Sequence, residues 1–384
     1  WVCVSGRVGC WRRSTIDGMT MQMTNDASVD AMLADLKTLV EIESPSRNLD
    51  ALATSAKAVA NLIEKHLGGA ATLIESAAGP HVHWSGGGEP KVLILGHHDT
   101  VFPLGTLERR PFKVEDGHAT GPGVFDMLGG IVQAVHGVAM VDDWSGVEIL
   151  MSADEEIGSH ASRALIEERA LACGAVLVLE GAADGGAIKI GRKGCGTFHV
   201  EIKGRASHAG LEPEAGVNAL IEASHQVIDI TTIGRPDIGT TVTPTVATAG
   251  TTDNVVPAAA KVIVDVRVES ADEKNRVEAA FAALAPHLSE ATISVTGGVN
   301  RPPMPESASA ELFAMARDVI PGIEGTSVGG GSDGNFTAAI GVPTLDGLGA
   351  VGGGAHADHE YLVVEAMVER ASLVAGLVTT LSRR

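Results

Sequence analysis

Short apolar segments alternate with amphipathic helical segments along most of the chain, and this alternation constrains the fold more than any other feature. Residues 91–95 (KVLIL) and 175–180 (AVLVLE) are nearly continuous apolar runs, which is typical of strands buried on both faces of a sheet. Segments 30–42, 51–67 and 129–141 carry apolar residues at helical spacing. Strands and helices that alternate in this way predict an α/β fold, with a mostly parallel sheet flanked by helices.

The pattern changes between about Arg192 and Pro305. Strands and helices follow there in the order β-α-β-β-α-β, which is the order of a ferredoxin-like α+β domain. We therefore predict a small domain inserted into a larger one. The predicted segments are an N-terminal extension at 1–25, the first part of the larger domain at 26–192, the inserted domain at 193–305 and the second part of the larger domain at 306–384.

The first residues differ from the rest of the chain. Residues 1–18 begin at Trp1 and lack the apolar stretch of a secretory signal, so we expect an extension with the working start near Met19, Met21 or Met23. No uninterrupted apolar run is long enough to predict a membrane span. The few cysteines predict neither a disulfide framework nor a zinc site, which favours a cytoplasmic protein. They are Cys3, Cys10, Cys173 and Cys195.

The net charge of the chain argues against two classes of binding partner. The chain has 28 Lys plus Arg against 48 Asp plus Glu, a formal net charge of −20. Nucleic acids and anionic membrane surfaces need a basic face, so neither is an expected partner. The surplus carboxylates either coat the surface or, in part, converge on a cation.

Acidic and imidazole side chains follow the carboxyl ends of several predicted strands or precede a helix. In open α/β sheets, the crevice beyond the strand ends is where ligands bind. Carboxylates brought there from separate segments would repel one another unless a cation or shared protons compensated. A mixed set of imidazoles and carboxylates suits zinc, and one carboxylate can bridge two ions. The residues are His97, Asp99, Asp126, Glu155, Glu156, Glu180 and His356.

Six motifs, taken together and in this order, resemble the co-catalytic zinc metallopeptidase family 20. That family includes glutamate carboxypeptidase, aminoacylase, acetylornithine deacetylase and succinyl-diaminopimelate desuccinylase. The stretch 101–126 is most similar to the glutamate carboxypeptidase (carboxypeptidase G type) branch. The motifs are GHHDTV at 96–101, GPGVFDMLGG at 121–130, DEEIGS at 154–159, VLEG at 178–181, GRASHAG at 204–210 and HADHEY at 356–361.

The resemblance implies a pair of metal sites in the larger, catalytic domain. His97 and Glu180 would bind one zinc, His356 and Glu156 the other, and Asp126 would bridge them. Two such ions lower the pKa of the attacking water and polarise the amide carbonyl. Two Zn²⁺ per subunit are expected, with Co²⁺ or Mn²⁺ as alternatives.

The resemblance also implies catalytic and substrate-binding residues. Asp99 would orient the His97 imidazole, and Glu155 would be the general base that relays a proton to the leaving amine. The inserted domain would act as a lid and dimerisation domain. It would contribute His208, Asn254 and Arg267 to substrate binding, with His208 supplied by the partner subunit in dimeric members, and Gly330–Asn335 would form a wall of the pocket.

Each of these residues also has a purely structural interpretation. A single carboxylate after a strand is more often a turn or helix cap than a ligand. Asn254 could be a turn residue before Pro257, and Arg267 could lie on a solvent face or in an ion pair. The histidines outside the predicted site are expected to pack or to lie at the surface; they are His81, His83, His98, His118, His160 and His359. Lys189, Arg192 and Lys193 are expected at the surface, with contact of one of them with the substrate as the alternative.

The sequence therefore predicts a two-zinc hydrolase that cleaves an amide bond beside a free carboxylate, most simply a glutamate carboxypeptidase-like exopeptidase acting on a small peptide as a homodimer. An N-acyl-amino-acid deacylase, of the acetylornithine deacetylase or aminoacylase type, is the alternative within the same chemistry. A metal- or nucleotide-binding protein without catalysis is a third reading. Against it, the Gly-rich turn GPGVFD lacks the third glycine of GxGxxG, no GxxxxGK[ST] motif is present, and every predicted ligand is kept.

Overall fold

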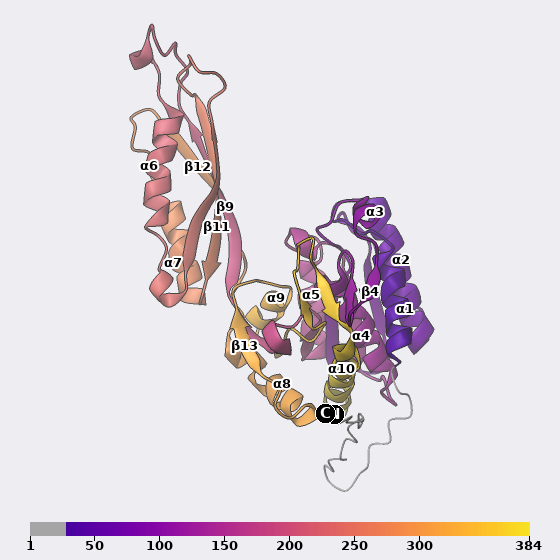
Figure 1. Cartoon of the computed structure of the whole chain (residues 1–384). Helices are drawn as coiled ribbons and strands as arrows, with labels where there is room; N and C mark the ends of the chain where they lie inside the picture. The colour runs from indigo at the N-terminus through magenta and orange to yellow at the C-terminus, as the bar shows by residue number, and fades with distance from the viewer. Residues whose placement is uncertain (1–27) are drawn as a thin grey trace, which may run out of the picture.

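The chain folds into two units. The computed structural model describes residues 28–384, so the predicted extension at 1–25 lies outside the described residues. Figure 1 shows a larger unit, built from the first and last parts of the described chain, and an elongated arm built from its middle. None of the described helices combines the length and the apolar composition that a membrane span requires.

A six-stranded sheet forms the centre of the larger unit. The three central strands, β6, β3 and β7, are neighbours and parallel, so their carboxyl ends meet at one edge. β14 continues the parallel part, whereas β1 and β2 add an antiparallel edge. In spatial order the strands are β1 (Thr72–Ile74), β2 (His81–Ser85), β6 (Val147–Ser152), β3 (Val92–His97), β7 (Val176–Val178) and β14 (Thr344–Leu345).

Helices cover both faces of this sheet. Alternate residues of β3 enter two different cores: Val92 and Ile94 pack into one, and Leu93 and Leu95 into the other. This explains why the sequence of β3 is apolar without alternation. The first core is covered by α1 (Val29–Val40), α2 (Leu49–Leu67), α4 (Gly129–Ala139), α8 (Glu306–Val319) and α10 (Met367–Ser382), and the second by α5 (Arg163–Cys173), which packs beside α9 (Gly334–Ala339).

The arm is a single antiparallel sheet covered by two helices. Its strands lie in the order β10-β11-β9-β12, and its core includes Phe198 stacked on Phe281 with ring centroids 3.8 Å apart. The chain enters the arm directly after β8 and leaves it at Arg301. The elements are β9 (Gly194–Lys203), α6 (Ala219–Thr231), β10 (Thr241–Ala249), β11 (Ala259–Val268), α7 (Ala271–Ala282) and β12 (Thr292–Arg301).

Several short elements complete the larger unit. β8 pairs in parallel with β13, and β15, β16, β5 and β4 form a separate antiparallel sheet. These pieces are too short for sequence periodicity to predict. They are α3 (Thr106–Arg109), β4 (Lys113–Glu115), β5 (His118–Thr120), β8 (Ile188–Arg192), β13 (Gly325–Val328), β15 (Gly352–Gly353) and β16 (Tyr361–Val363). The predicted fold class, a helix-flanked α/β sheet with an inserted α+β domain, is confirmed.

Candidate metal centre

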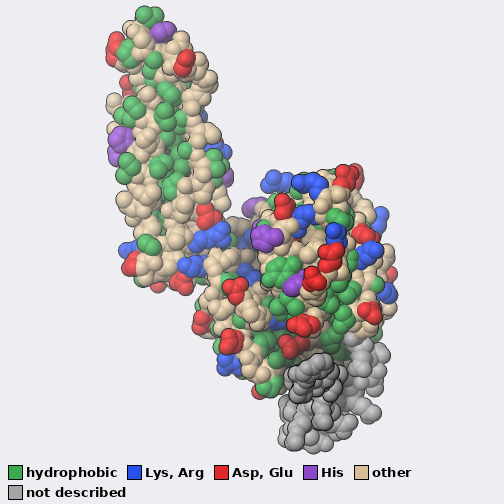
Figure 2. All heavy atoms as spheres, viewed as in Figure 1, with side chains coloured by type: hydrophobic (Ala, Val, Ile, Leu, Met, Phe, Trp, Pro, Cys, Tyr) green, Lys and Arg blue, Asp and Glu red, His purple; other side chains and the backbone are tan. Residues whose placement is uncertain are grey.

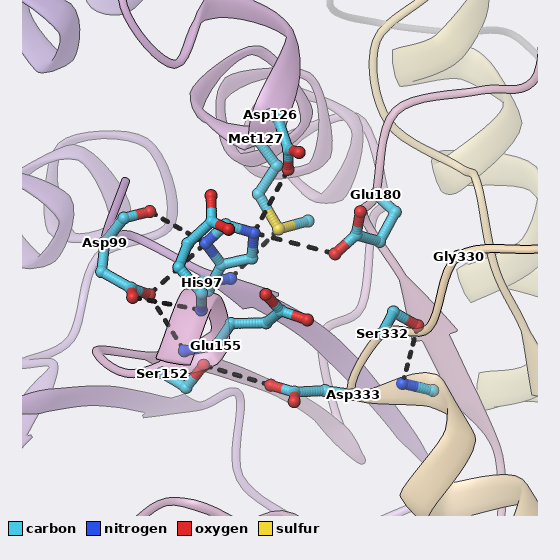
Figure 3. Close-up of polar contacts among 12 residues, drawn as sticks. His97, Asp99, Asp126, Met127, Ser152, Glu155, Glu180, Gly330, Ser332 and Asp333 are labelled. Carbon is cyan, nitrogen blue, oxygen red and sulfur yellow. Dashed lines mark hydrogen bonds and ion pairs between the residues drawn. The ribbon is translucent and has the colours of Figure 1, made fainter. Parts of the chain in front are cut away.

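Five acidic or imidazole residues from separate segments meet at the carboxyl edge of the central strands. Figure 3 shows three of them, His97, Asp126 and Glu180. His97 ends β3, Glu156 lies just after β6, and Glu180 lies just after β7. Because these strands are adjacent and parallel, their ends deliver the three side chains to one place. Asp126 comes from the turn before α4, and His356 from the loop between β15 and β16.

The two imidazoles lie on either side of the Asp126 carboxylate. His97 Nε2 is 3.4 Å from Asp126 Oδ1 and 3.7 Å from Glu180 Oε1. His356 Nε2 is 3.3 Å from Asp126 Oδ2 and 3.1 Å from Glu156 Oε2. Each oxygen of Asp126 therefore faces a different imidazole, and each imidazole has a second carboxylate of its own.

This donor set fits a pair of metal ions. His97 Nε2, Asp126 Oδ1 and Glu156 Oε1 are buried, and none has a hydrogen-bond partner among the described residues. Burying such atoms without a partner is unfavourable, and a bound cation would satisfy all three. His97, Asp126 and Glu156 each offer a ligand atom within 4.8 Å of the others, and so do His97, Glu155 and Glu180.

The electrostatics of the cluster favour added positive charge. Burial raises the pKa of Glu156, and burial together with the Asp126 charge raises the pKa of Glu180 to about 7. Burial opposes ionisation of Asp126 as well, but the neighbouring His356 and His97 imidazoles hold its pKa well below the ordinary value. Protons or metal ions must therefore compensate the converging carboxylates.

Asp99 holds the loops of the cluster together. His97 Nδ1 lies 2.9 Å from the backbone oxygen of Asp99, closer than the 3.5 Å to its carboxylate Oδ1. The carboxylate accepts hydrogen bonds from Ser46 Oγ at 2.7 Å and from the backbone N–H groups of Glu155 and Glu156 at 3.1 and 3.3 Å. Asp99 thus orients the His97 ring mainly through its backbone and the Glu155–Glu156 turn through its side chain.

Glu155 lies beside the metal-site carboxylates and contacts an arginine from the end of the arm. Arg301 Nη2 donates to Glu155 Oε1 at 2.8 Å and to Asp333 Oδ1 at 3.2 Å. Burial raises the pKa of Glu155 well above its ordinary value. Arg301 was not among the predicted site residues, and Asp333 lies in the segment Gly330–Asn335, which was predicted only to form a wall of the pocket.

A second missed residue is Glu360, which is 1% exposed. Its carboxylate accepts hydrogen bonds from the backbone N–H groups of Gly123, Phe125 and Asp126, at 2.9, 3.0 and 3.0 Å. Glu360 therefore holds the turn that presents Asp126. It stands inside the motif HADHEY, but that motif gave no local reason to separate it from a surface residue.

Comparison with known proteins gives the family. The model of Peptidase family M20/M25/M40 matches residues 93–380. The chain belongs to this family. It is 32% identical to carboxypeptidase G2 of Pseudomonas sp. (strain RS-16), over 95% of this chain and 92% of that protein. It is therefore a hydrolase of a metallopeptidase family, as the motifs predicted.

Two more distant relatives share most of the chain. A succinyl-diaminopimelate desuccinylase of Caulobacter vibrioides is 26% identical over 76% of this chain and 82% of its own length. The M20 family metallo-carboxypeptidase Sso-CP2 of Sulfolobus solfataricus superimposes with a TM-score of 0.71 at 16% identity, over 93% of this chain and 99% of that one. The second comparison supports the fold alone.

The structure contradicts the predicted surface position of Arg192. Arg192 was expected at the surface, but it is 5% exposed. Its Nε donates to Asp346 Oδ2 at 2.6 Å, and its Nη1 to the backbone oxygen of Gly330 at 3.0 Å. Arg192 Nη2 also lies 3.7 Å from Glu180 Oε2. The partner Asp346 is 154 residues away in the sequence, so no local pattern indicated the burial.

The arm residues fall into two groups. Arg267 lies near the larger unit and lines a cavity of about 820 Å³ that also includes Glu156. Its guanidinium forms two hydrogen bonds with Asp265, at 3.0 and 2.9 Å. His208 follows the last residue of β9 and Asn254 precedes the first residue of β11, at the end of the arm far from Arg267. There the Ala209 N–H donates a hydrogen bond to the backbone oxygen of Asn254 at 2.9 Å. A ten-residue strand spans roughly 30 Å, so these two residues are not brought to the metal centre of their own chain.

Proposed function

We propose that this M20 hydrolase is a dinuclear zinc exopeptidase that cleaves the amide bond before a C-terminal glutamate-like residue. The observation that carries the proposal is the position of Asp126 between His97 and His356. In this assignment His97, Glu180 and Asp126 hold one ion, and His356, Glu156 and Asp126 hold the other. Co²⁺ and Mn²⁺ suit the same donors.

When bound, the metal pair supplies Lewis-acid polarisation of the scissile carbonyl and acidifies the attacking water. The protein's own residues supply the proton transfers. Glu155 accepts the proton of the attacking water and passes it to the leaving amine. Arg301 and the Asp99 carboxylate, which accepts hydrogen bonds from the Glu155 and Glu156 N–H groups, keep the Glu155 turn in position.

Recognition of the substrate's free carboxylate is assigned to the arm. Arg267 binds Asp265 through Nε and Nη2, which leaves its Nη1 to donate to a substrate carboxylate, and it lines the same cavity as Glu156. His208 and Asn254 would serve the site of a partner subunit. Exposed apolar residues on the arm support such a homodimer; they are Leu211, Leu220, Ile221, Ile228 and Val246.

A deacylase acting on N-acyl amino acids is the second candidate. Such a deacylase would use the same metal centre as the exopeptidase, and only the acyl part of its substrate would differ. The similarity to a succinyl-diaminopimelate desuccinylase supports this second candidate function.

The two free cysteines among the described residues, Cys173 and Cys195, are compatible with the cytoplasmic location inferred from the sequence.

The test is hydrolysis of a panel of peptidyl and N-acyl amino acids by zinc-loaded protein. Release of glutamate should be fastest, and Glu155→Gln should lower kcat at least about a hundredfold while both metals stay bound. Glu168→Gln, at an exposed site on α5, is the matched control. Full turnover by metal-loaded Glu155→Gln would refute the mechanism, and equal release of alanine or ornithine would refute the glutamate assignment.

A further inference from the structure

The cavity beside the metal centre has walls from both units. The larger unit contributes Arg47, Glu156 and His160, and the arm contributes Arg267 and neighbouring strand residues. Lys and Arg side chains gather where the arm meets the larger unit (Figure 2). The cavity lining itself holds three arginines, Arg47, Arg267 and Arg301, and three carboxylates, Glu156, Asp265 and Glu278.

The three arginines that line this cavity differ in their partners. Arg301 is paired with Glu155 and Asp333, and Arg267 with Asp265. Arg47 is exposed, and no carboxylate in the described residues lies within 4.0 Å of its guanidinium. Its hydrogen-bond donors are therefore available to a ligand in the cavity.

The backbone of Arg47 is held in an unusual conformation. Its φ is +72°, in the left-handed region that favours glycine. The residues on both sides hold it there: Ser46 donates to Asp99 Oδ2 at 2.7 Å, and Asn48 Oδ1 caps α2 by accepting from Ala51 N–H at 3.1 Å. A side chain kept at a strained position directly beside a functional cluster suggests a role in binding.

We propose that Arg47 binds a carboxylate on the acyl side of the substrate. Arg47 comes from the larger unit and Arg267 from the arm, and both line one cavity together with Glu156 of the metal centre. A substrate with its scissile amide at the metal centre would extend one end toward each wall. The preferred substrates would then carry a carboxylate at both ends, as a short dicarboxylic acyl group joined to an amino acid does. This inference rests on the proposed function.

The experiment compares two substrates that differ only in charge at the acyl end, N-succinyl-L-glutamate and its neutral amide N-succinamoyl-L-glutamate. Zinc-loaded wild-type protein should have a kcat/KM about tenfold higher for the acid, mostly through KM. Arg47→Gly, which suits the left-handed backbone, should bring this ratio close to one, and Arg47→Lys should keep most of it. Arg383→Gly, an exposed arginine at the end of α10, is the matched control and should keep the full ratio.

The outcomes separate the two proposals. A wild-type ratio near one, or an unchanged ratio in Arg47→Gly, would overturn the role of Arg47 while leaving the hydrolase intact. If Arg47→Gly instead removed discrimination between glutamate and glutamine as the leaving residue, Arg47 would serve the amino side and the proposal would be wrong. Calorimetric binding of both compounds to zinc-loaded Glu155→Gln gives the same ratio without turnover, so absence of hydrolysis would count against the proposed function alone.

Discussion

At the scale of single residues, the metal centre depends on side chains that do not belong to the donor set. Glu360 is the clearest case, because its carboxylate accepts three backbone N–H groups of the turn that carries Asp126. A carboxylate can accept all three, whereas an amide presents an NH₂ group to one or more of them. The position of Asp126 between the two imidazoles should therefore depend on the charge and shape of Glu360.

Glu360→Gln should weaken zinc binding about 10- to 100-fold, the range seen when a group that holds a metal ligand is replaced. Activity at saturating zinc should recover in part, because Asp126 itself is unchanged. Calorimetric titration with zinc gives the affinity. Glu365→Gln, an exposed neighbour, is the control, and equal zinc affinity in both variants would remove Glu360 from this role.

Some residues of the metal centre could be predicted from the sequence, and others could not. His97, Glu156 and Glu180 each follow an apolar strand, so their convergence could be inferred from the parallel sheet and from the family motifs. Glu360 and Arg301 act on partners 234 and 146 residues away, and Arg192 is buried only because Asp346 meets it. Such pairings follow from the packed fold, and local spacing does not contain them.

At the scale of elements, a polar cluster joins three helices of the larger unit. Asp35 of α1 is 7% exposed, and its Oδ2 lies 2.7 Å from His66 Nε2 of α2 and 2.9 Å from His136 Nε2 of α4. Its Oδ1 lies 2.5 Å from Lys65 Nζ. Burial opposes ionisation of Asp35, but the hydrogen bonds from Lys65, His136 and His66 hold its pKa below the ordinary value.

Asp35→Asn should reduce the free energy of unfolding by about 1–3 kcal/mol, because it leaves a buried cluster with one charged acceptor fewer. Urea unfolding at pH 7.5, followed by tryptophan fluorescence, measures the change. Asp50→Asn, an exposed residue in the first turn of α2, is the control. A change below about 0.5 kcal/mol would show that the cluster contributes no more than surface ion pairs do.

The cluster should also make stability depend on pH. Burial lowers the pKa of His136 below 6.5, so the unfolded chain gains a proton at this residue before the folded chain does. Stability from His136 is complete above about pH 6.5 and decreases as the pH falls. His136→Gln should flatten the decrease between pH 6.5 and 5, whereas the exposed control His225→Gln should leave the slope unchanged. Equal slopes for wild type and His136→Gln would contradict this account.

At the scale of the whole molecule, the converging carboxylates should make stability depend on the metals. Zinc binds the folded chain better than the unfolded one, so loading both sites should raise Tm by roughly 5–10 °C over chelated protein. Thermal unfolding with and without zinc measures this, and magnesium, which prefers octahedral oxygen ligands, is the control. Glu156→Gln should lower the stoichiometry from about two ions per chain toward one. No shift in Tm on zinc addition would contradict the metal assignment.

The tip of the arm lies far from the metal centre of its own chain. Its tip carries His208 and Asn254, roughly 30 Å of strand away from the junction with the larger unit. β10 is an edge strand with exposed residues along most of its length, and α6 exposes Leu220, Ile221 and Ile228. Unpaired strand edges and exposed apolar faces are typical of interfaces. For His208 to act in a partner's site, the proposed two-fold dimer has to bring each tip to the partner's larger unit.

Mixing two inactive variants tests whether the tip acts in the partner's site. His208→Ala removes the tip residue, and Glu155→Gln removes the base; each homodimer should be nearly inactive. In a mixed dimer, the His208→Ala subunit keeps its own Glu155 and receives the partner subunit's His208, so one of its two sites is complete. Random exchange at equal amounts should restore about a quarter of wild-type activity. If differently tagged subunits of the two variants co-purify as mixed dimers but activity stays at background, His208 acts within its own chain or not at all.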